Sequence, residues 1–407
     1  MTVAGRGAAV VFVWLAAISA AGAQVLPSEP LALAGGRVTL GADISATVGG
    51  SDPGFFNYTD YDHSALRMLR VDVMGSLNAG DHFAFLGELR SENVDGLVPY
   101  ALYVRIRPWA ARHIDIQAGR IPPTFGAFAR RTYANDNPLI GYPLAYQYLT
   151  SLRPDSLPAS ADDVFRRRGS GWLTRFTIGD TTLDRGVPLV SAFRWDTGVQ
   201  LHGGAPHGLV NAIVAVTTGT LSNPLFTDDN AGRQLAGRVE IRPLVGLVVG
   251  TSVARGPFVT SAAARAAAAD GRDGEFTQTA WGGDLEYSRG HYLLRLESIV
   301  SAWRLPIVRA PVLQLPLRAV STSVEGRYRL TPGLYAAARF DHLGFSDLAG
   351  TQLVQPWDAP VTRVEAGMGY SLLRNLQVKL SVQRNTRDGG SLERRTTIGA
   401  AQLVFWF

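Results

Sequence analysis

Cysteine is absent from this 407-residue chain. Without thiols the protein has no disulfide framework, no thiolate zinc site and no lipid attached to a cysteine. Long apolar runs are also missing. After the first twenty-odd residues, no stretch reaches the ~18 apolar residues that a membrane-spanning helix needs. A chain of this length must gain its stability in another way, and a hydrogen-bonded barrel closed in lipid is one such way.

Lysine is almost absent as well, because Lys379 is the only lysine among 39 basic residues, against 34 acidic ones. This mild basic excess forms no tail or block, so the sequence does not support nucleic-acid binding. Leu380 follows the single lysine, which excludes a Walker A loop, and neither His-Glu-x-x-His nor Gly-x-Ser-x-Gly occurs. We therefore expect no enzymatic activity, no cofactor and no metal site.

The N-terminus has the layout of a secretory signal peptide. Arg6 precedes an apolar core, Ala8–Ala20, and Ala21-Gly22-Ala23 forms a small-x-small cleavage site. We expect residues 1–23 to be removed near Ala23 and residues 24–36 to form a short periplasmic segment. A buried N-terminal helix is the alternative interpretation.

From Arg37 onward, short segments alternate apolar and polar residues with a period of two, which is typical of strands whose two faces meet different solvents. In the segment 69–77 one face carries Leu69, Val71, Val73, Gly75 and Leu77, and the other carries Arg70, Asp72, Met74 and Ser76. The polar faces of all such segments hold nearly balanced bases and acids, which we expect to pair across strands. The bases assigned to this enclosed wall are Arg70, Arg90, Arg105, Arg107, Arg194, Arg238, Arg295, Arg327, Arg339, Arg363 and Lys379.

The connections separate a membrane barrel from a soluble sandwich. Very short links such as Asn78–Asp81 alternate with long ones such as Gly49–Ser64, as in outer-membrane barrels with periplasmic turns and outer loops. This alternation of short and long connections predicts an all-β fold. We expect a transmembrane antiparallel β-barrel over residues 37–407 with about 16 strands (14–18). The stretch 171–190 is ambiguous, because Trp172–Ile178 suits an extra strand or part of a loop. Ser261–Ala269, rich in alanine, suits a short helix.

The last segment, Thr396–Phe407, alternates and ends on an aromatic residue. A soluble protein seldom exposes such an apolar edge, whereas pairing with the first strand would close a barrel and remove the edge. This terminal Phe407 resembles the closing strand of outer-membrane proteins, which the barrel-assembly machinery reads as a sorting signal.

The third long link, Pro122 to about Gly186, is too long for a passive connection and is rich in aromatics. The strand before it ends in a Gly-x-x-x-Pro-x-x-Gly run, from Gly119 to Gly126, that leads into the link. Here the chain resembles the sixteen-stranded bacterial porins, including the phosphate-selective porin family. The resemblance implies a constriction loop folded into the lumen and a homotrimer. It also implies a ladder of arginines along the pore and a cluster of lysines at the pore mouth. This chain has one lysine and therefore lacks the lysine cluster.

The charged residues of this link are the candidate pore-lining site. If the link enters the lumen, they set a field across the narrowest point; otherwise they lie solvated on an outer surface loop. They are Arg130, Arg131, Arg153, Asp155, Asp162, Asp163, Arg166, Arg167 and Arg168.

The sequence therefore predicts an outer-membrane porin that lets small hydrophilic solutes and ions diffuse passively, with a weak preference for anions. Small anionic or neutral solutes are the expected substances that pass. Outer-membrane lipid and the barrel-assembly machinery are the other expected partners. The alternatives are a non-conducting barrel for binding or adhesion, a soluble β-structure, and an outer-membrane hydrolase, which would need a serine and a histidine near one rim. A TonB-dependent transporter is excluded by the few residues before the first strand.

Overall fold

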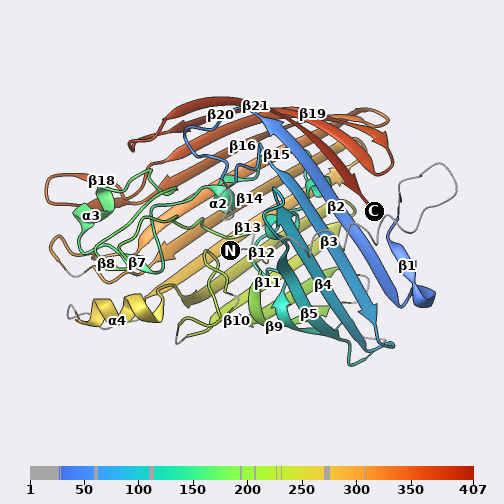
Figure 1. The fold of residues 1–407 in the computed structure, drawn as a ribbon, viewed down its shortest axis with the longest axis horizontal. Helices are drawn as coiled ribbons and strands as arrows, with labels where there is room; N and C mark the ends of the chain where they lie inside the picture. Colours follow the sequence, from blue (N-terminus) through green and yellow to red (C-terminus); the bar gives the residue numbers. More distant parts are fainter. Residues whose placement is uncertain are drawn as a thin grey trace, which may run out of the picture.

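The computed structural model shows one antiparallel sheet of sixteen barrel strands closed on itself (Figure 1). It describes residues 27, 29–58, 63–109, 114–192, 195–205, 208–225, 227–230, 232–269, 276–307 and 309–407, and only the backbone of Arg130. The predicted signal peptide and its cleavage site lie outside these residues. The barrel strands are β2 (Val38–Gly49), β3 (Leu69–Asn78), β4 (Phe83–Glu92), β5 (Val98–Ile106), β6 (Ile114–Ile121), β9 (Asp196–Gly204), β10 (Val210–Thr217), β11 (Gln234–Leu244), β12 (Leu247–Pro257), β13 (Thr277–Arg289), β14 (Tyr292–Trp303), β15 (Leu317–Thr331), β16 (Leu334–Phe345), β19 (Val361–Leu373), β20 (Leu376–Arg387) and β21 (Arg395–Trp406).

Closure comes from the last strand. β21 pairs with β20 on one side and with β2 on the other, with Asp43 opposite Trp406 and Gly49 opposite Ala400. The amide and carbonyl of Phe407 also bond to Ala42. The predicted strand number and the predicted pairing of the last strand with the first are both confirmed.

Every barrel strand pairs with its neighbours along the chain, so short turns and long loops fall at opposite ends of the barrel. We name the connections at the loop end L1 (50–68), L2 (93–97), L3 (122–195), L4 (218–233), L5 (258–276), L6 (304–316), L7 (346–360) and L8 (388–394); L2 is the exception to the rule, because it is as short as a turn. By the usual rule for bacterial barrels, the loop end is the outer side.

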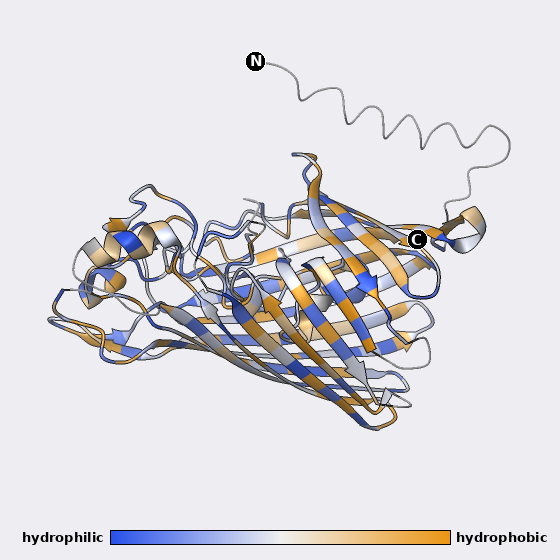
Figure 2. Cartoon of the chain, turned by 90° about the horizontal axis from the view of Figure 1, so that it is seen from below, coloured by the Kyte–Doolittle hydropathy of each residue, from blue (hydrophilic) through white to orange (hydrophobic). Residues whose placement is uncertain are grey.

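The wall alternates as the sequence predicts (Figure 2). On β20, Leu380 and Val382 are about half exposed on the outside, whereas Lys379, Ser381 and Gln383 are buried inside. In lipid this leaves apolar side chains toward hydrocarbon and every strand edge paired, so the chain is an outer-membrane β-barrel.

The remaining elements are short. They are β1 (Leu31–Leu33), η1 (Ala34–Gly36), η2 (Phe128–Arg130), η3 (Ala134–Asp136), α2 (Leu144–Gln147), β7 (Ser156–Leu157), α3 (Ala161–Phe165), β8 (Ile178–Gly179), α4 (Ser261–Ala269), β17 (Asp347–Ala349) and β18 (Val354–Pro356). The helix expected at Ser261–Ala269 is present as α4. None of the helices in the described part of the chain has the length and apolar character needed to cross a membrane.

One boundary differs from the prediction. The third connection runs to 195 rather than to about Gly186, because β9 starts at Asp196. The ambiguous stretch belongs to this loop: Ile178–Gly179 pairs only with Ser156–Leu157, and Thr174 pairs only with Asp184. L3 thus contains its own small sheet. The apolar and polar residues of this sheet alternate in the sequence in the same way as those of a barrel strand.

Candidate functional site

The lumen wall is lined by ion pairs that cross from strand to strand. Arg70 Nη2 on β3 lies 2.6 Å from Glu92 Oε1 on β4, and Arg90 Nε lies 2.5 Å from Asp72 Oδ1. All four side chains are nearly inaccessible to solvent. Removing either partner would leave a buried charge without compensation, so both members of each pair are needed to keep the wall stable.

A larger cluster covers the wall from β15 to β19. Arg339 bonds to Asp341 at 3.0 Å, to Glu365 at 2.6 Å and to Glu325 at 3.3 Å. Arg295 extends the row, because it bridges Glu325 at 3.1 Å and Glu286 at 3.0 Å. On the β11–β13 side, Arg238 bonds to Asp284 at 2.5 Å. Ionic groups therefore line an interior that the apolar outer wall encloses.

Two glycines direct the chain from β6 into the barrel. Gly119 has φ +127° and Gly126 has φ +78°, conformations that residues with a side chain rarely adopt. A Cβ at Gly119 would lie 2.4 Å from the carbonyl oxygen of Leu102, and one at Gly126 would lie 2.3 Å from the hydroxyl of Tyr146. Both ends of the Gly-x-x-x-Pro-x-x-Gly run are thus fixed by backbone geometry and close packing.

L3 is hydrogen-bonded to the wall formed by β2–β4 and β20. Asp43 accepts from the amides of Ala134 and Asn135, both at 3.3 Å. Lys379 Nζ donates to the carbonyl oxygens of Ala134 and Asn137. Two tyrosines complete this side: Arg70 Nη1 donates to Tyr142 Oη at 2.6 Å, and Tyr133 Oη donates to Glu88 Oε2 at 2.6 Å.

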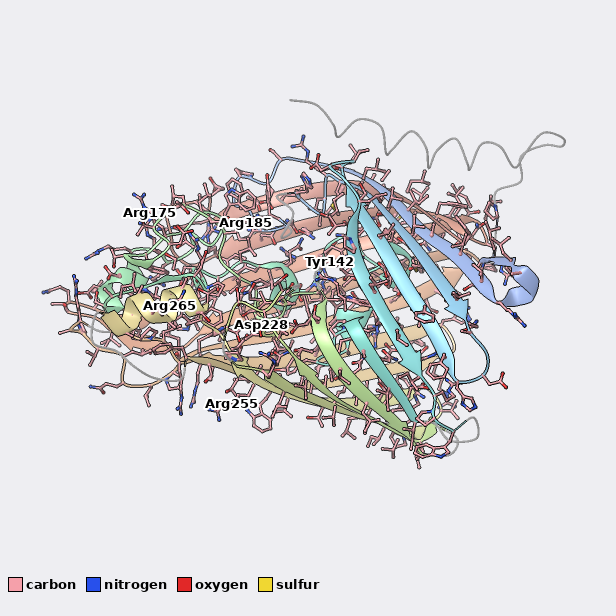
Figure 3. All side chains as sticks on the ribbon, turned by 60° about the horizontal axis from the view of Figure 1, so that its bottom comes forward. Tyr142, Arg175, Arg185, Asp228, Arg255 and Arg265 are labelled. Carbon is pink, nitrogen blue, oxygen red and sulfur yellow. The ribbon has the colours of Figure 1, made fainter. Side chains whose placement is uncertain are left out.

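The same loop is bonded to the other side of the barrel. Glu297 on β14 accepts from the Ala127 amide at 2.7 Å and from Tyr146 Oη at 2.6 Å. The amide of Gly126 donates to Ser252 Oγ on β12 at 3.1 Å. L3 therefore crosses the interior, and Tyr142 lies in the middle of the barrel (Figure 3).

Aromatic packing orders the loop between these anchors. Phe128 contacts Tyr142 and Tyr146, with ring centroids 5.7 and 5.0 Å apart. Tyr148 stacks obliquely on Phe56 of L1 with centroids 6.4 Å apart. These rings belong to one apolar cluster that includes Trp303 and Trp357. The loop therefore forms a packed apolar core of its own and is not an extended, solvated segment.

The predicted loop residues fall into an inner and an outer group. In the inner part, Arg131 Nη1 lies 2.7 Å from Glu286 Oε2 of the wall. Arg153 is buried, bonds to Asp155 at 2.8 Å and donates to the carbonyl oxygens of Thr174 and Thr182. Arg153 thus holds L3 to itself beside β7 and β8, which lie at the loop end, and it lines a small pocket there with Asp155 and Asp184. The side chain of Arg130 lies outside the described part of the chain.

The outer group lies at the loop end of the barrel, around α3. Asp163 caps α3, accepting from the backbone of Ala159 and Ser160, and its Oδ1 pairs with Arg166 at 2.5 Å. Arg168 donates to Gln355 Oε1 of L7 at 2.6 Å. Arg167 lines a surface pocket with Arg166 and Arg175. Figure 3 shows Arg175 at the loop end of the barrel.

Asp162 links α3 to L7, since it accepts from the amide and hydroxyl of Thr351 at 2.9 and 2.6 Å. These two donors hold the pKa of the Asp162 carboxyl below its usual range. Asp358 of L7 shows the opposite effect: it accepts from the amides of Ser151 and Gly169, yet burial raises its pKa. Both carboxylates fasten L3 to L7 at the outer side.

Among the other predicted wall residues, Arg363 is fully buried and donates to the carbonyl oxygens of Tyr142 and Phe56, both at 2.7 Å. Arg107 lies just beyond β5 and pairs with Asp115 at 2.9 Å. Arg327 lies over the ring of Tyr335. Arg105 lies on β5, opposite Ala84 and Gln117, and Arg194 falls outside the described residues.

The described part of the barrel contains hollows on the lumen side, and two of them bear on the proposed site. One opens toward the turn end and is lined by Arg107, Asp115, Arg238, Glu240 and Arg242 among others. A much smaller one lies between L3 and the β13–β15 wall, where Arg131 and Arg295 face four carboxylates: Asp284, Glu286, Glu297 and Glu325. In the described residues, no group of three or more His, Asp or Glu side chains is placed to hold a metal ion.

Sequence reasoning did not identify the side chains that anchor L3, namely Asp43, Tyr142, Tyr146 and Glu297. Asp43 and Glu297 look like any other polar residue on an alternating strand. The concentration of tyrosine in the loop was the available signal, but it does not say which wall residue each hydroxyl meets.

No protein-family model matches this sequence, and no curated protein matches it. Solved structures do. The anion-selective porin from Comamonas acidovorans matches with a TM-score of 0.54 and 10% identity, over 91% of this chain and 99% of that one. The outer-membrane channel DcaP of Acinetobacter baumannii matches with 0.53 and 11%, over 91% and 97%. The trimer form of OmpT, an outer membrane protein of Vibrio cholerae, matches with 0.51 and 10%, over 91% and 99%. At these identities the comparisons establish the fold: this chain has the barrel of the sixteen-stranded outer-membrane porins.

Proposed function

We propose that this protein is an outer-membrane channel through which small hydrophilic solutes and ions diffuse passively. The observation that carries the proposal is the enclosed ionic wall. A barrel that served only as a membrane anchor could fill its interior with apolar side chains at lower cost, because buried ion pairs seldom add stability over well-packed hydrophobic residues. The hollow at the turn end, lined by Arg107, Asp115 and Arg238, gives water an entrance to this wall.

L3 forms the constriction in this proposal. Its inner segment leaves a narrow space against β13–β15, lined by Arg131 and by wall carboxylates. Charged side chains at a narrow point select ions by sign, so this segment is the expected selectivity element. Substances that pass must be small, because L3 is bonded to both sides of the barrel.

A weak anion preference accompanies the proposal. The pocket at the outer mouth has Arg166, Arg167 and Arg175 against the single acid Asp163. The inner space is acidic by contrast, so the two regions oppose each other and the net preference is small. The reversal potential of the purified protein in a tenfold salt gradient tests this, and clear cation selectivity would refute it.

A non-conducting barrel for binding or adhesion is the second candidate, and one observation favours it. L3 is bonded both to the β2–β4 wall, through Asp43, and to β14, through Glu297. A loop anchored on both sides could act as a plug. Deleting residues 127–147 distinguishes the candidates: a channel conducts before the deletion and conducts more after it, whereas a plugged barrel conducts only after it.

We propose further that three copies assemble in the membrane and that assembly begins with recognition of Phe407. The trimer form of a structural neighbour supports the first point. The apolar wall of the short strands β3–β5, where Val73, Phe85 and Leu102 point outward, offers a surface for it. Chemical cross-linking in native membranes tests the trimer, and truncation of Phe407 followed by measurement of folded barrel in the outer membrane tests the recognition.

A further inference from the structure

In the described part of the chain, the arginines that point outward from the barrel wall at its loop end include two neighbouring pairs. They are Arg304, Arg318, Arg384 and Arg395, all exposed. The direction of each follows from its neighbours: Trp303 and Leu317, adjacent in sequence to two of them, are buried inside. These arginines therefore lie on the lipid-facing side, where an unneutralised charge needs a reason.

The four form two diagonal pairs, and the two diagonals run in opposite senses relative to the loop end. Arg318 on β15 lies opposite Ala302 on β14, so Arg304, two residues further on, is its diagonal neighbour across L6. Arg395 on β21 lies opposite Thr386 on β20, so Arg384 is its diagonal neighbour across L8. Diagonal neighbours on one face of a sheet are about 7–8 Å apart. Two guanidinium groups at that spacing can hold one phosphate between them.

Their height on the wall matches the membrane boundary. Tyr328 faces outward near the turn end of β15, ten residues from Arg318, and Phe405 lies ten residues from Arg395 on β21. At about 3.4 Å per residue and a tilt of about 40°, ten residues rise roughly 26 Å along the barrel axis. The apolar band of such barrels is about 25 Å tall. If the aromatic residues lie at one interface, these arginines lie at the other, among the headgroups of the outer leaflet.

No carboxylate neutralises these side chains. In the described part of the chain none of the four guanidinium groups forms an ion pair, and Glu393 accepts from the backbone amide of Arg395 rather than from its side chain. The outer rim of this wall is thus positively charged at the height where lipid phosphates occur.

We propose that the Arg304–Arg318 and Arg384–Arg395 pairs bind phosphorylated headgroups of outer-leaflet lipids. An arginine on the lipid face is costly at the bilayer midplane but costs little near the interface, so the rim tolerates these residues even without a ligand. Bound phosphate turns them into an attachment between barrel and leaflet. This inference is independent of whether the barrel conducts.

Binding of purified lipid A, a diphosphorylated acylated disaccharide, to the full-length protein tests the proposal. Native mass spectrometry would count the lipid retained by the wild-type barrel, by R304Q/R318Q and by R384Q/R395Q. R166Q/R167Q is the matched control, because it removes two arginines from the same end of the barrel but from the water-facing mouth. Resistance of the folded barrel to SDS at room temperature checks folding of each variant.

Each rim variant should retain one lipid A molecule fewer than the wild type, because its other arginine pair is intact, and the control should retain as many as the wild type. The wild type should retain less lipid A stripped of its phosphates than either rim variant retains of the intact lipid. Equal losses in R166Q/R167Q, unchanged binding in both rim variants, or displacement of the lipid by millimolar inorganic phosphate would overturn the proposal. In the first case the effect would be one of net charge, in the second the arginines would be merely solvated, and in the third the site would take a free anion.

Discussion

Lys379, the only lysine of the chain, donates its Nζ protons to the carbonyl oxygen of Ala134 in L3. A second bond goes from the same ammonium group to Asn137. Lys379 is almost completely buried on the lumen side of β20. It therefore anchors the inner loop to the wall and does not offer a charge to solutes at the mouth.

Replacing Lys379 by methionine should loosen L3. Two buried carbonyl groups would lose their donor, at about 1–3 kcal/mol for each group left unsatisfied. Urea unfolding in lipid vesicles should show the loss, and single-channel recordings should show larger current fluctuations. Gln377→Met, on the same strand and face, should change both far less, because its Oε1 accepts only a 3.5 Å contact from Tyr335.

Replacing Arg339 by methionine should destabilise the barrel strongly. It would leave Asp341, Glu365 and Glu325 without their shared partner, and breaking a buried ion pair costs about 3–5 kcal/mol. The matched variant is Arg107→Gln, whose pair with Asp115 is partly exposed and is worth less than about 1 kcal/mol. Equal unfolding free energies for the two variants would show that the Arg339 cluster is not a structural element.

The entry of L3 into the barrel should depend on Gly126. In Gly126→Ala the new Cβ would clash with the Tyr146 hydroxyl, and the positive φ adds strain of about 1–3 kcal/mol. We expect a lower unfolding free energy and faster cleavage of L3 by added protease. Gly283→Ala is the control, since a Cβ there would meet no atom within 4 Å. Protease resistance unchanged in Gly126→Ala would contradict this account of the turn.

The barrel itself could be predicted from the sequence, and the site only in part. The alternation of apolar and polar residues along segments such as 69–77 indicates which solvent each strand face meets. The positions of turns and loops along the sequence indicate the number of strands. Both features can therefore be predicted from local sequence pattern. The start of β9 does not follow from it, because Ile178–Gly179 pairs inside L3 and produces the same local pattern as a wall strand.

Which charges meet in three dimensions could not be predicted. Arg153 and Arg166 both lie in polar, aspartate-containing segments, but one is buried against the carbonyl oxygens of Thr174 and Thr182 and the other is exposed beside α3. Their roles depend on how L3 folds, and that folding depends on long-range contacts such as the one between Tyr146 and Glu297.

The contact between α3 and L7 should depend on pH. The Asp162 carboxylate has a lowered pKa because Thr351 donates to it twice, so the stabilisation is present above the usual pKa of an aspartate and disappears as the pH falls through the lowered value. Hydrogen exchange should show a protected Thr351 amide at neutral pH in the wild type and an unprotected one in Asp162→Asn. The two proteins should become alike in strong acid. If the Thr351 amide of the wild type stayed protected in strong acid, the Asp162 carboxylate would not be the group that holds α3 to L7.

The absence of cysteine permits a direct test of the channel. Asn211 on β10 lines the hollow at the turn end, whereas Val214, on the same strand, points outward and is 58% exposed. In planar bilayers, a charged water-soluble methanethiosulfonate reagent should reduce the conductance of Asn211→Cys in discrete steps and leave that of Val214→Cys unchanged. A wild-type protein without conductance, or equal responses from the two variants, would contradict passage of ions through the barrel interior.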